Sequence, residues 1–317
     1  MHKQRLILYT TLVVVGISAA IGFAYLAGKS SSDDAIDHAS AEYPLLARRI
    51  FLDKPNDTLL NFVPLRKTLD QRLAAINAKH SLYFEYLPTG TTVRNGDTES
   101  IVGASLLKLP VVMDLYRAAE LGKVNLDTVV EVKPEMLNDQ YGDLYKKGAG
   151  TKISLREAAA YALEKSDNTA ILLVQDNIRG LLEPDETALA AVDADFDIAG
   201  STVLINAKSY SSILKCLYFA CYVNRDSSQE ILDSLTKTPF GDRITAPIPP
   251  DIKVAHKIGV NVDTFSESDC GIFYVPRRPY TLCIMLDLPE EQAKPLLAEL
   301  SSLVYNAVTS QNTSEKE

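Results

Sequence analysis

Ser105 and Lys108 place a hydroxyl and an amine one helical turn apart in the apolar stretch "GASLLKLPVV". Residues three apart share one face of a helix, so the two side chains are within reach of each other. A serine hydroxyl is a poor nucleophile until an adjacent base accepts its proton. A desolvated lysine can be that base, because burial lowers the pKa of an amine. The spacing also arises by chance in many chains, so the prediction of nucleophilic catalysis depends on other parts of the sequence.

Two further stretches carry polar residues suited to such a site. Ser166-Asp167-Asn168 stands in "LEKSDNTA" at a predicted helix end, and Lys257-Ile258-Gly259 stands in "VAHKIGV" on a predicted strand. Each also has a purely structural interpretation. Ser, Asp and Asn cap helices well, and a lysine with a glycine suits an edge strand or a bulge.

Together and in this order, the three stretches resemble the signature of class A β-lactamases and related penicillin-binding proteins: Ser-x-x-Lys, Ser-Asp-Asn and Lys-Thr-Gly. The segments around them, "SLYFEYLPTGTTVRNGDTESIVGASLLKLPVV" and "DCGIFYVPRRPYTLCIML", are similar to that family as well. The resemblance covers about residues 65–310. It implies a serine acyl-hydrolase that acts through a covalent ester on Ser105 and needs no metal or cofactor.

The resemblance also implies how an ester would form. Ser105 is the nucleophile, and Lys108 accepts its proton as a neutral amine. One oxyanion donor is the backbone N–H of Ser105, and the other is the N–H of Val260, which follows Gly259 of the third stretch. These four residues are therefore the expected centre of the reaction.

Three further residues have expected roles by the same resemblance. Ser166 would pass a proton to the leaving nitrogen, and Asn168 would hold the substrate amide. Lys257 would raise the local positive potential and help to bind a substrate carboxylate.

The sequence departs from the family pattern at two places. Ile258 replaces the threonine of the third motif, and the lost hydrogen bond to a charged group is worth roughly 1.5–3 kcal/mol, a ten- to hundredfold weaker binding. Class A enzymes deacylate with a loop glutamate between the second and third motifs. Here that stretch is short and offers only Glu183 and Glu186, which we interpret as solvated loop charges. The sequence thus supports acylation better than rapid turnover.

Three functions remain open at this stage. The first is hydrolysis of β-lactams, and the second is a slow-turnover penicillin-binding or DD-carboxypeptidase-like reaction on D-alanyl-D-alanine peptides of the cell wall. The third is a non-catalytic envelope module for binding or sensing that keeps the fold. Five polar residues of the three motifs favour an enzyme, because a binding module does not need all of them: Ser105, Lys108, Ser166, Asn168 and Lys257.

The elements that must position these residues are two early strands, a central block of helices, three late strands and a terminal helix. Helical spacing covers residues 65–76, residues 82–94 indicate a β-hairpin, and capping boxes at Ser154–Glu157 and Ser227–Glu230 begin central helices. Three late strands and a closing helix follow in "KVAHKIGV", "GIFYV", "YTLCIMLDL" and "PEEQAKPLLAELSSLVYNAV". We expect an α+β fold in three layers, with a mostly antiparallel five-stranded sheet flanked by helices and an all-helical subdomain.

The N-terminus predicts a membrane anchor. Residues 6–28 are uncharged and long enough to span a bilayer, and Lys3 and Arg5 precede them. We therefore expect a cytoplasmic tip at 1–5, a single transmembrane signal-anchor helix at 6–28, a polar linker at 29–55 and an extracytoplasmic hydrolase domain at 56–317. A cleaved signal peptide, with a small-residue site at Gly22 and Ala24, is the alternative.

Composition limits the partners. The net charge of −9 argues against nucleic-acid binding, which depends on basic residues that neutralise phosphates. The four cysteines stand in apolar runs without metal-ligand spacing, so we expect buried thiols. A Cys270–Cys283 disulfide is the alternative if the two late strands are neighbours outside the cytoplasm.

Overall fold

The computed structural model describes residues 42–47, 60–200 and 202–310. The chain divides into two units, 1–44 and 45–317, and the second contains the elements described below. The predicted span at 6–28 lies outside the described residues. Among the helices that are described, none is long and apolar enough to cross a membrane.

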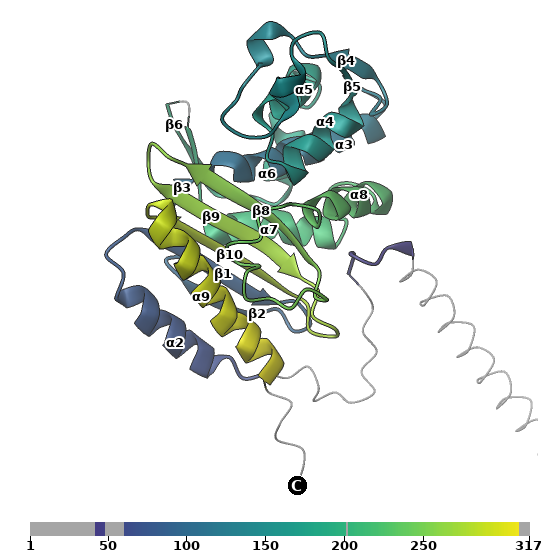
Figure 1. The fold of residues 1–317 in the computed structure, drawn as a ribbon. Coiled ribbons are helices and arrows are strands. Elements are labelled where there is room, and N and C mark those ends of the chain that lie inside the picture. The colour runs from purple at the N-terminus through teal and green to yellow at the C-terminus, as the bar shows by residue number, and fades with distance from the viewer. Residues whose placement is uncertain (1–41, 48–59, 201, 311–317) are drawn as a thin grey trace, which may run out of the picture. The chain divides into compact units, whose positions relative to one another are not determined.

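A five-stranded antiparallel sheet forms the middle layer of the second unit (Figure 1). It joins the early hairpin to the three late strands, as the sequence predicts. The strands, in spatial order, are β2 Thr91–Asn95, β1 His80–Tyr86, β10 Tyr280–Asp287, β9 Ser266–Phe273 and β8 Val254–Asn261. The last of these, β8, is an edge strand, so one side of its backbone has no partner strand in this sheet.

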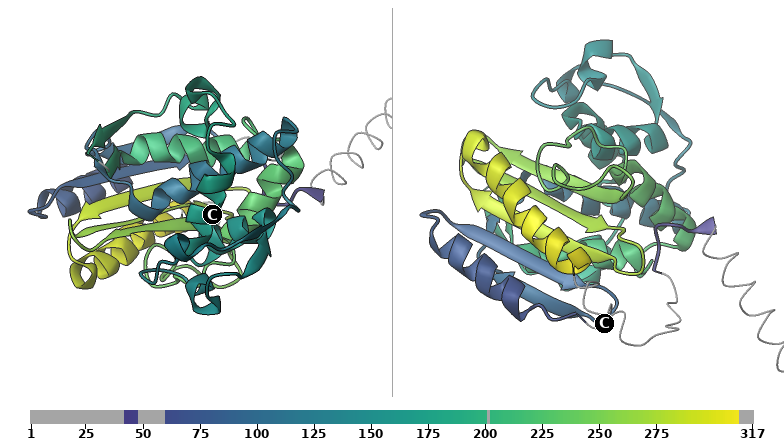
Figure 2. Two further views of the ribbon diagram at one scale, coloured as in Figure 1. Left: turned by 90° about the horizontal axis from the view of Figure 1, so that it is seen from above. Right: turned by 60° about the horizontal axis from the view of Figure 1, so that its bottom comes forward.

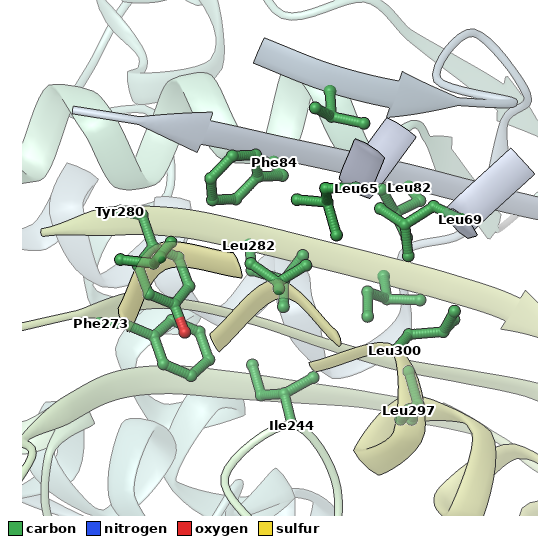
Figure 3. Close-up of a cluster of buried hydrophobic side chains, with 14 of the residues drawn as sticks. Leu65, Leu69, Leu82, Phe84, Ile244, Phe273, Tyr280, Leu282, Leu297 and Leu300 are labelled. Atoms are coloured by element: carbon green, nitrogen blue, oxygen red, sulfur yellow. The ribbon is translucent and has the colours of Figure 1, made fainter. Parts of the chain in front are cut away.

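Helices α2 (Val63–Ala74) and α9 (Glu290–Thr309) cover one face of the sheet (Figures 1 and 2). Their leucines pack against aromatic and aliphatic side chains of β1 and β10 in the main hydrophobic core (Figure 3). Phe84 and Tyr280 are both fully buried there, with ring centroids 5.6 Å apart. Burial of such side chains is the dominant stabilising contribution to folding, so this layer holds the sheet that carries the third motif.

The other face of the sheet carries α7 (Ala207–Tyr218), and the remaining helices extend beyond it as the predicted helical subdomain (Figure 1). Ser154 and Glu157 form the predicted capping box at the start of α4. Two small sheets were not predicted, because their strands are too short for a clear alternation. The remaining helices are α3 Lys108–Glu120, α4 Leu155–Glu164, α5 Asn168–Ile178, α6 Ala188–Ala191 and α8 Arg225–Leu235. One small sheet contains β3 Ile101–Val102, β7 Thr202–Ile205 and β6 Phe196–Ala199. The other contains β4 Val129–Glu131 and β5 Lys152–Ser154.

The expected capping box of Ser227 and Glu230 is wrong. Asn224 is the N-cap of α8, and its side chain accepts a 2.9 Å hydrogen bond from the Ser227 N–H. Glu230 instead forms an ion pair with Arg156 of α4. Asn caps as well as Ser does, so the helix begins one turn earlier than the sequence pattern predicts.

The expectation of free buried thiols is also wrong. Cys270 and Cys283 face each other directly on β9 and β10 and form a disulfide, the alternative that the sequence left open. Cys216 and Cys221 form a second disulfide at the end of α7. Spacing alone does not show which positions of a sheet become partners, so only the register of the strands reveals the first pair.

Candidate active site

Ser105 lies in the 3-10 helix Ala104–Leu107, which runs directly into α3. Lys108, the first residue of α3, donates a 2.7 Å hydrogen bond from Nζ to the Oγ of Ser105. Pro110 falls in the first turn of α3, where a missing N–H costs nothing. Ala104 has a φ of 43°, which is a strained value for a residue with a side chain. Residues with strained backbone are concentrated at functional sites.

Lys108 is buried, with 6% of its surface exposed. Its Nζ also donates to the backbone oxygen of Ser166 at 2.7 Å and to the Oδ1 of Asn168 at 2.6 Å. Burial lowers the pKa of Lys108 to about 8, against a smaller opposite effect of the Asp167 carboxylate. At pH 7 about one molecule in ten would then hold the neutral amine that can accept the Ser105 proton.

Ser166 is fully buried between two lysines. Its Oγ accepts hydrogen bonds from Lys257 Nζ at 2.8 Å and from Lys108 Nζ at 3.3 Å. Burial lowers the pKa of Lys257 well below its ordinary value, and the charge of Lys108 lowers it further. Ser166 has a φ of 54°, so this second site residue also has strained backbone.

Asn168 is held from both ends of its amide. Its Oδ1 accepts from Lys108, which can only donate, and its Nδ2 donates to the Oδ1 of Asn138 at 3.1 Å. The Oδ1 of Asn138 is itself fixed by the N–H of Gln140 at 3.1 Å. Sequence reasoning missed Asn138, because nothing in the chain connects it to a residue thirty positions away.

Asp167 shapes the turn that carries Ser166 and Asn168. Its carboxylate accepts the N–H groups of Ala170, Asp143 and Leu144, each at 2.8 Å. The first of these makes Asp167 the N-cap of α5, as the structural interpretation of the motif predicts. The other two tie the turn to a neighbouring loop of the helical subdomain.

Gly259 lets β8 approach the 3-10 helix closely. A Cβ at this position would lie 2.8 Å from the Cγ of Leu106 and 3.0 Å from the backbone oxygen of Gly103. The next residue, Val260, lines the same cavity as Ser105. Ser105 and Val260, whose N–H groups are the expected oxyanion donors, thus line one cavity.

A cavity of about 440 Å³ opens beside Ser105. Lys108, Asn168 and Val260 contribute to its walls, and none of the described residues that line it carries a carboxylate. Among the described residues, no three or more His, Cys, Asp or Glu side chains are grouped so as to hold a metal ion.

Ile258 is 1% exposed and does not line the cavity. Successive side chains of a strand point to opposite faces, so Ile258 points away from the face that carries Lys257. It shares its face with Val254, a member of the main hydrophobic core. An apolar residue at position 258 is therefore consistent with packing on the α9 side of the sheet.

The two candidate deacylating glutamates lie away from the cavity. Glu186 pairs with Lys123 at 3.3 Å, just beyond the C-terminal end of α3, and its side chain accepts the N–H of Glu183 at 2.9 Å. Ser105 and Lys108 stand at the opposite end of α3, whose thirteen residues span about 20 Å. Both glutamates are thus solvated loop charges, as the sequence interpretation holds.

Comparison with known proteins agrees with this arrangement. The profile described as "Beta-lactamase enzyme family" matches residues 64–308. No protein with a curated function matches the chain. Solved structures with a similar fold include PBP-A, at 19% identity with a TM-score of 0.70 over 78% of this chain and 98% of that one.

Two further similar structures are β-lactamases. One, from Sphaerobacter thermophilus, is 18% identical with a TM-score of 0.70, covering 78% of this chain and 98% of that one. An ancestral class A β-lactamase is 20% identical with a TM-score of 0.68, covering 77% of this chain and 99% of that one. At these identities the likeness concerns the fold.

Proposed function

Since the chain belongs to the β-lactamase enzyme family and is a serine hydrolase of that type, we propose that it forms an acyl-enzyme on Ser105 and releases the acyl group slowly. The observation that carries the proposal is the 2.7 Å hydrogen bond between Lys108 Nζ and Ser105 Oγ, inside a buried cluster with Ser166 and Lys257. The substrate is a β-lactam or a D-alanyl-D-alanine-like peptide, which are chemically alike at the reacting amide.

Acylation proceeds in two steps. In the first, Ser105 Oγ attacks the amide carbon, neutral Lys108 takes the hydroxyl proton, and the N–H groups of Ser105 and Val260 bind the oxyanion. In the second, the carbon–nitrogen bond breaks, and the leaving nitrogen receives a proton from Lys108 through Ser166. The product is an ester on Ser105 with an amine that a linear peptide releases and that stays attached to the acyl group of an opened β-lactam.

Slow release follows from the composition of the cavity wall. Hydrolysis of the ester needs a base beside the attacking water, which in class A enzymes is a loop glutamate. Within the described part of the chain no carboxylate lines this cavity, and Glu183 and Glu186 lie beyond the far end of α3. The proposed behaviour is therefore that of a penicillin-binding protein rather than of an efficient β-lactamase.

Two side chains are suited to substrate recognition, the amine of Lys257 and the amide of Asn168. Lys257 places a buried amine near Ser166, which in its protonated form suits the carboxylate that both substrate classes carry. Asn168 offers an amide to the substrate amide. A mutant of the structurally similar PBP-A has been solved as an acyl-enzyme with penicillin G.

We place the reaction outside the cytoplasm on a chain anchored by residues 6–28. The uncharged stretch behind Lys3 and Arg5 supports this orientation. The two disulfides of the domain also suit an oxidising compartment.

The test is the lifetime of the adduct. The protein is labelled with a fluorescent penicillin, excess reagent is removed, and the bound label is followed over time. We expect it to persist for minutes to hours. Loss of the label within milliseconds would overturn the slow-release proposal and indicate a true β-lactamase with another deacylating group.

A further inference from the structure

The active-site cavity continues along α5, away from Ser105. Asn168, Ile171 and Gln175 all line it, and spacings of three and four residues put these side chains on one face of the helix. Seven residues at 1.5 Å each place Gln175 about 10 Å beyond Asn168 along the axis. Beyond Ser105, Lys108 and Asn168, the cavity lining includes Leu107, Val111, Ile171, Gln175, Thr202 and Val203, and we call this part of the cavity the α5 arm.

Four of the six residues that line the α5 arm are apolar, and Thr202 adds one hydroxyl. Leu107 and Val111 come from the junction of the 3-10 helix with α3, and Val203 comes from β7. Among the described residues that line the whole cavity, Lys108 has the one charged side chain, which is cationic when protonated. A positive group that entered the arm would therefore lose hydration on its apolar side and find no carboxylate of these residues to pair with.

Gln175 contributes its side-chain amide to the arm. Its side chain is exposed and makes no hydrogen bond to another described residue. A neutral amide can donate and accept hydrogen bonds, but it cannot neutralise an ammonium. Gln175 is thus suited to an uncharged group and free to contact one.

We propose that the α5 arm binds the acyl side chain of the substrate, and that Gln175 is a specificity-determining residue that favours apolar acyl groups without an ammonium. The inference rests on the proposed acylation of Ser105 and on Asn168 as the partner of the substrate amide. The side chain that extends from that amide then lies against the next turns of α5, where Ile171 and Gln175 stand.

Benzylpenicillin and ampicillin test the proposal, because they differ by one amino group on the acyl side chain. Acylation rates of the full-length protein are measured by intact mass at slightly acidic pH, where that amine is protonated. We expect ampicillin to acylate at least about tenfold more slowly than benzylpenicillin. Equal rates, or a faster reaction with ampicillin, would overturn the inference while leaving the acylation of Ser105 intact.

A charge substitution tests Gln175 itself. Gln175→Glu places a carboxylate in the arm. It should lower the ratio of the benzylpenicillin acylation rate to the ampicillin acylation rate several-fold. Gln71→Glu makes the same change on the exposed surface of α2 and should leave the ratio unchanged. An unchanged ratio in Gln175→Glu, or equal narrowing in both variants, would contradict the role of Gln175. No acylation by either penicillin would instead contradict the proposed function.

Discussion

The Nζ of Lys257 lies 2.8 Å from the Oγ of Ser166, in the interior of the protein. Lys257 donates this hydrogen bond, and Lys108 Nζ lies 3.3 Å from the same oxygen. The Oγ of Ser166 thus acts as an acceptor here, so its own proton is free to point at a substrate. The arrangement suits a group that delivers a proton to a leaving nitrogen.

The rate of acylation should depend on the protonation of Lys108. Only the neutral amine can accept the Ser105 proton, and burial lowers the pKa of Lys108 to about 8. The rate should therefore rise with pH and approach a plateau above pH 8, with about a tenth of that plateau at pH 7. Stopped-flow acylation by a chromogenic β-lactam over a pH series measures this. A rate that falls as pH rises from 6 to 8 would contradict the role of Lys108.

Gly259→Ala should displace Val260, whose N–H is an expected oxyanion donor, from Ser105. The added methyl would meet Leu106 Cγ at 2.8 Å and Gly103 O at 3.0 Å, so β8 must move away from Ser105. We expect a loss of about 10²-fold or more in acylation rate, as for the loss of one oxyanion donor. Gly241→Ala is the matched control, since its new methyl has only Thr245 Oγ1 at 4.0 Å. Similar activity in the two variants would show that the close approach is not needed.

Asn138 should orient Asn168 during substrate binding. Asn138→Ala removes the acceptor of Asn168 Nδ2, and we expect about tenfold weaker binding of a penicillin in the acylation kinetics. Asn138→Asp keeps an acceptor and should restore binding. Its carboxylate should also raise the pKa of Lys108 and move the pH profile to higher pH. A pH profile that is identical in the Asp variant and the wild type would argue for a purely structural role.

Asp114 should make the domain less stable as pH rises from 4 to 6. Burial raises its pKa to about 6, so the folded state holds this proton more tightly than the unfolded state does. The stability that the bound proton provides is present at low pH and is lost as pH rises through the folded pKa. Asp114→Asn keeps the acceptor for Ala188 N–H and should raise the free energy of unfolding at pH 7 by up to about 3 kcal/mol.

Denaturant unfolding of both proteins at several pH values measures this difference. It should shrink towards zero near pH 4, where both side chains are neutral. An Asn variant that is less stable than the wild type at pH 7 would contradict the prediction.

Local sequence patterns predicted the parts of the site that local geometry controls. Ser105 and Lys108 meet because helical spacing alone puts them on one face. The resemblance to a known family added Ser166, Asn168 and Lys257, which come from distant segments. The structure brings these residues together through hydrogen bonds to Lys108 and Ser166.

Contacts without a local pattern were not predictable. Asn138 reaches Asn168 across thirty residues, and Cys270 meets Cys283 only through the register of two strands. The start of α8 was misplaced because two good capping residues, Asn224 and Ser227, compete within one turn. In each case the outcome depends on tertiary packing that the order of residues does not show.

The most direct test of the account is covalent labelling at Ser105. The protein is incubated with benzylpenicillin beside a Ser105→Ala variant, and intact mass with peptide mapping locates any adduct. The account predicts one added penicillin on the peptide that contains Ser105 in the wild type and none in the variant. Equal labelling of both proteins, or no adduct on the folded wild type at any pH between 6 and 9, would contradict it.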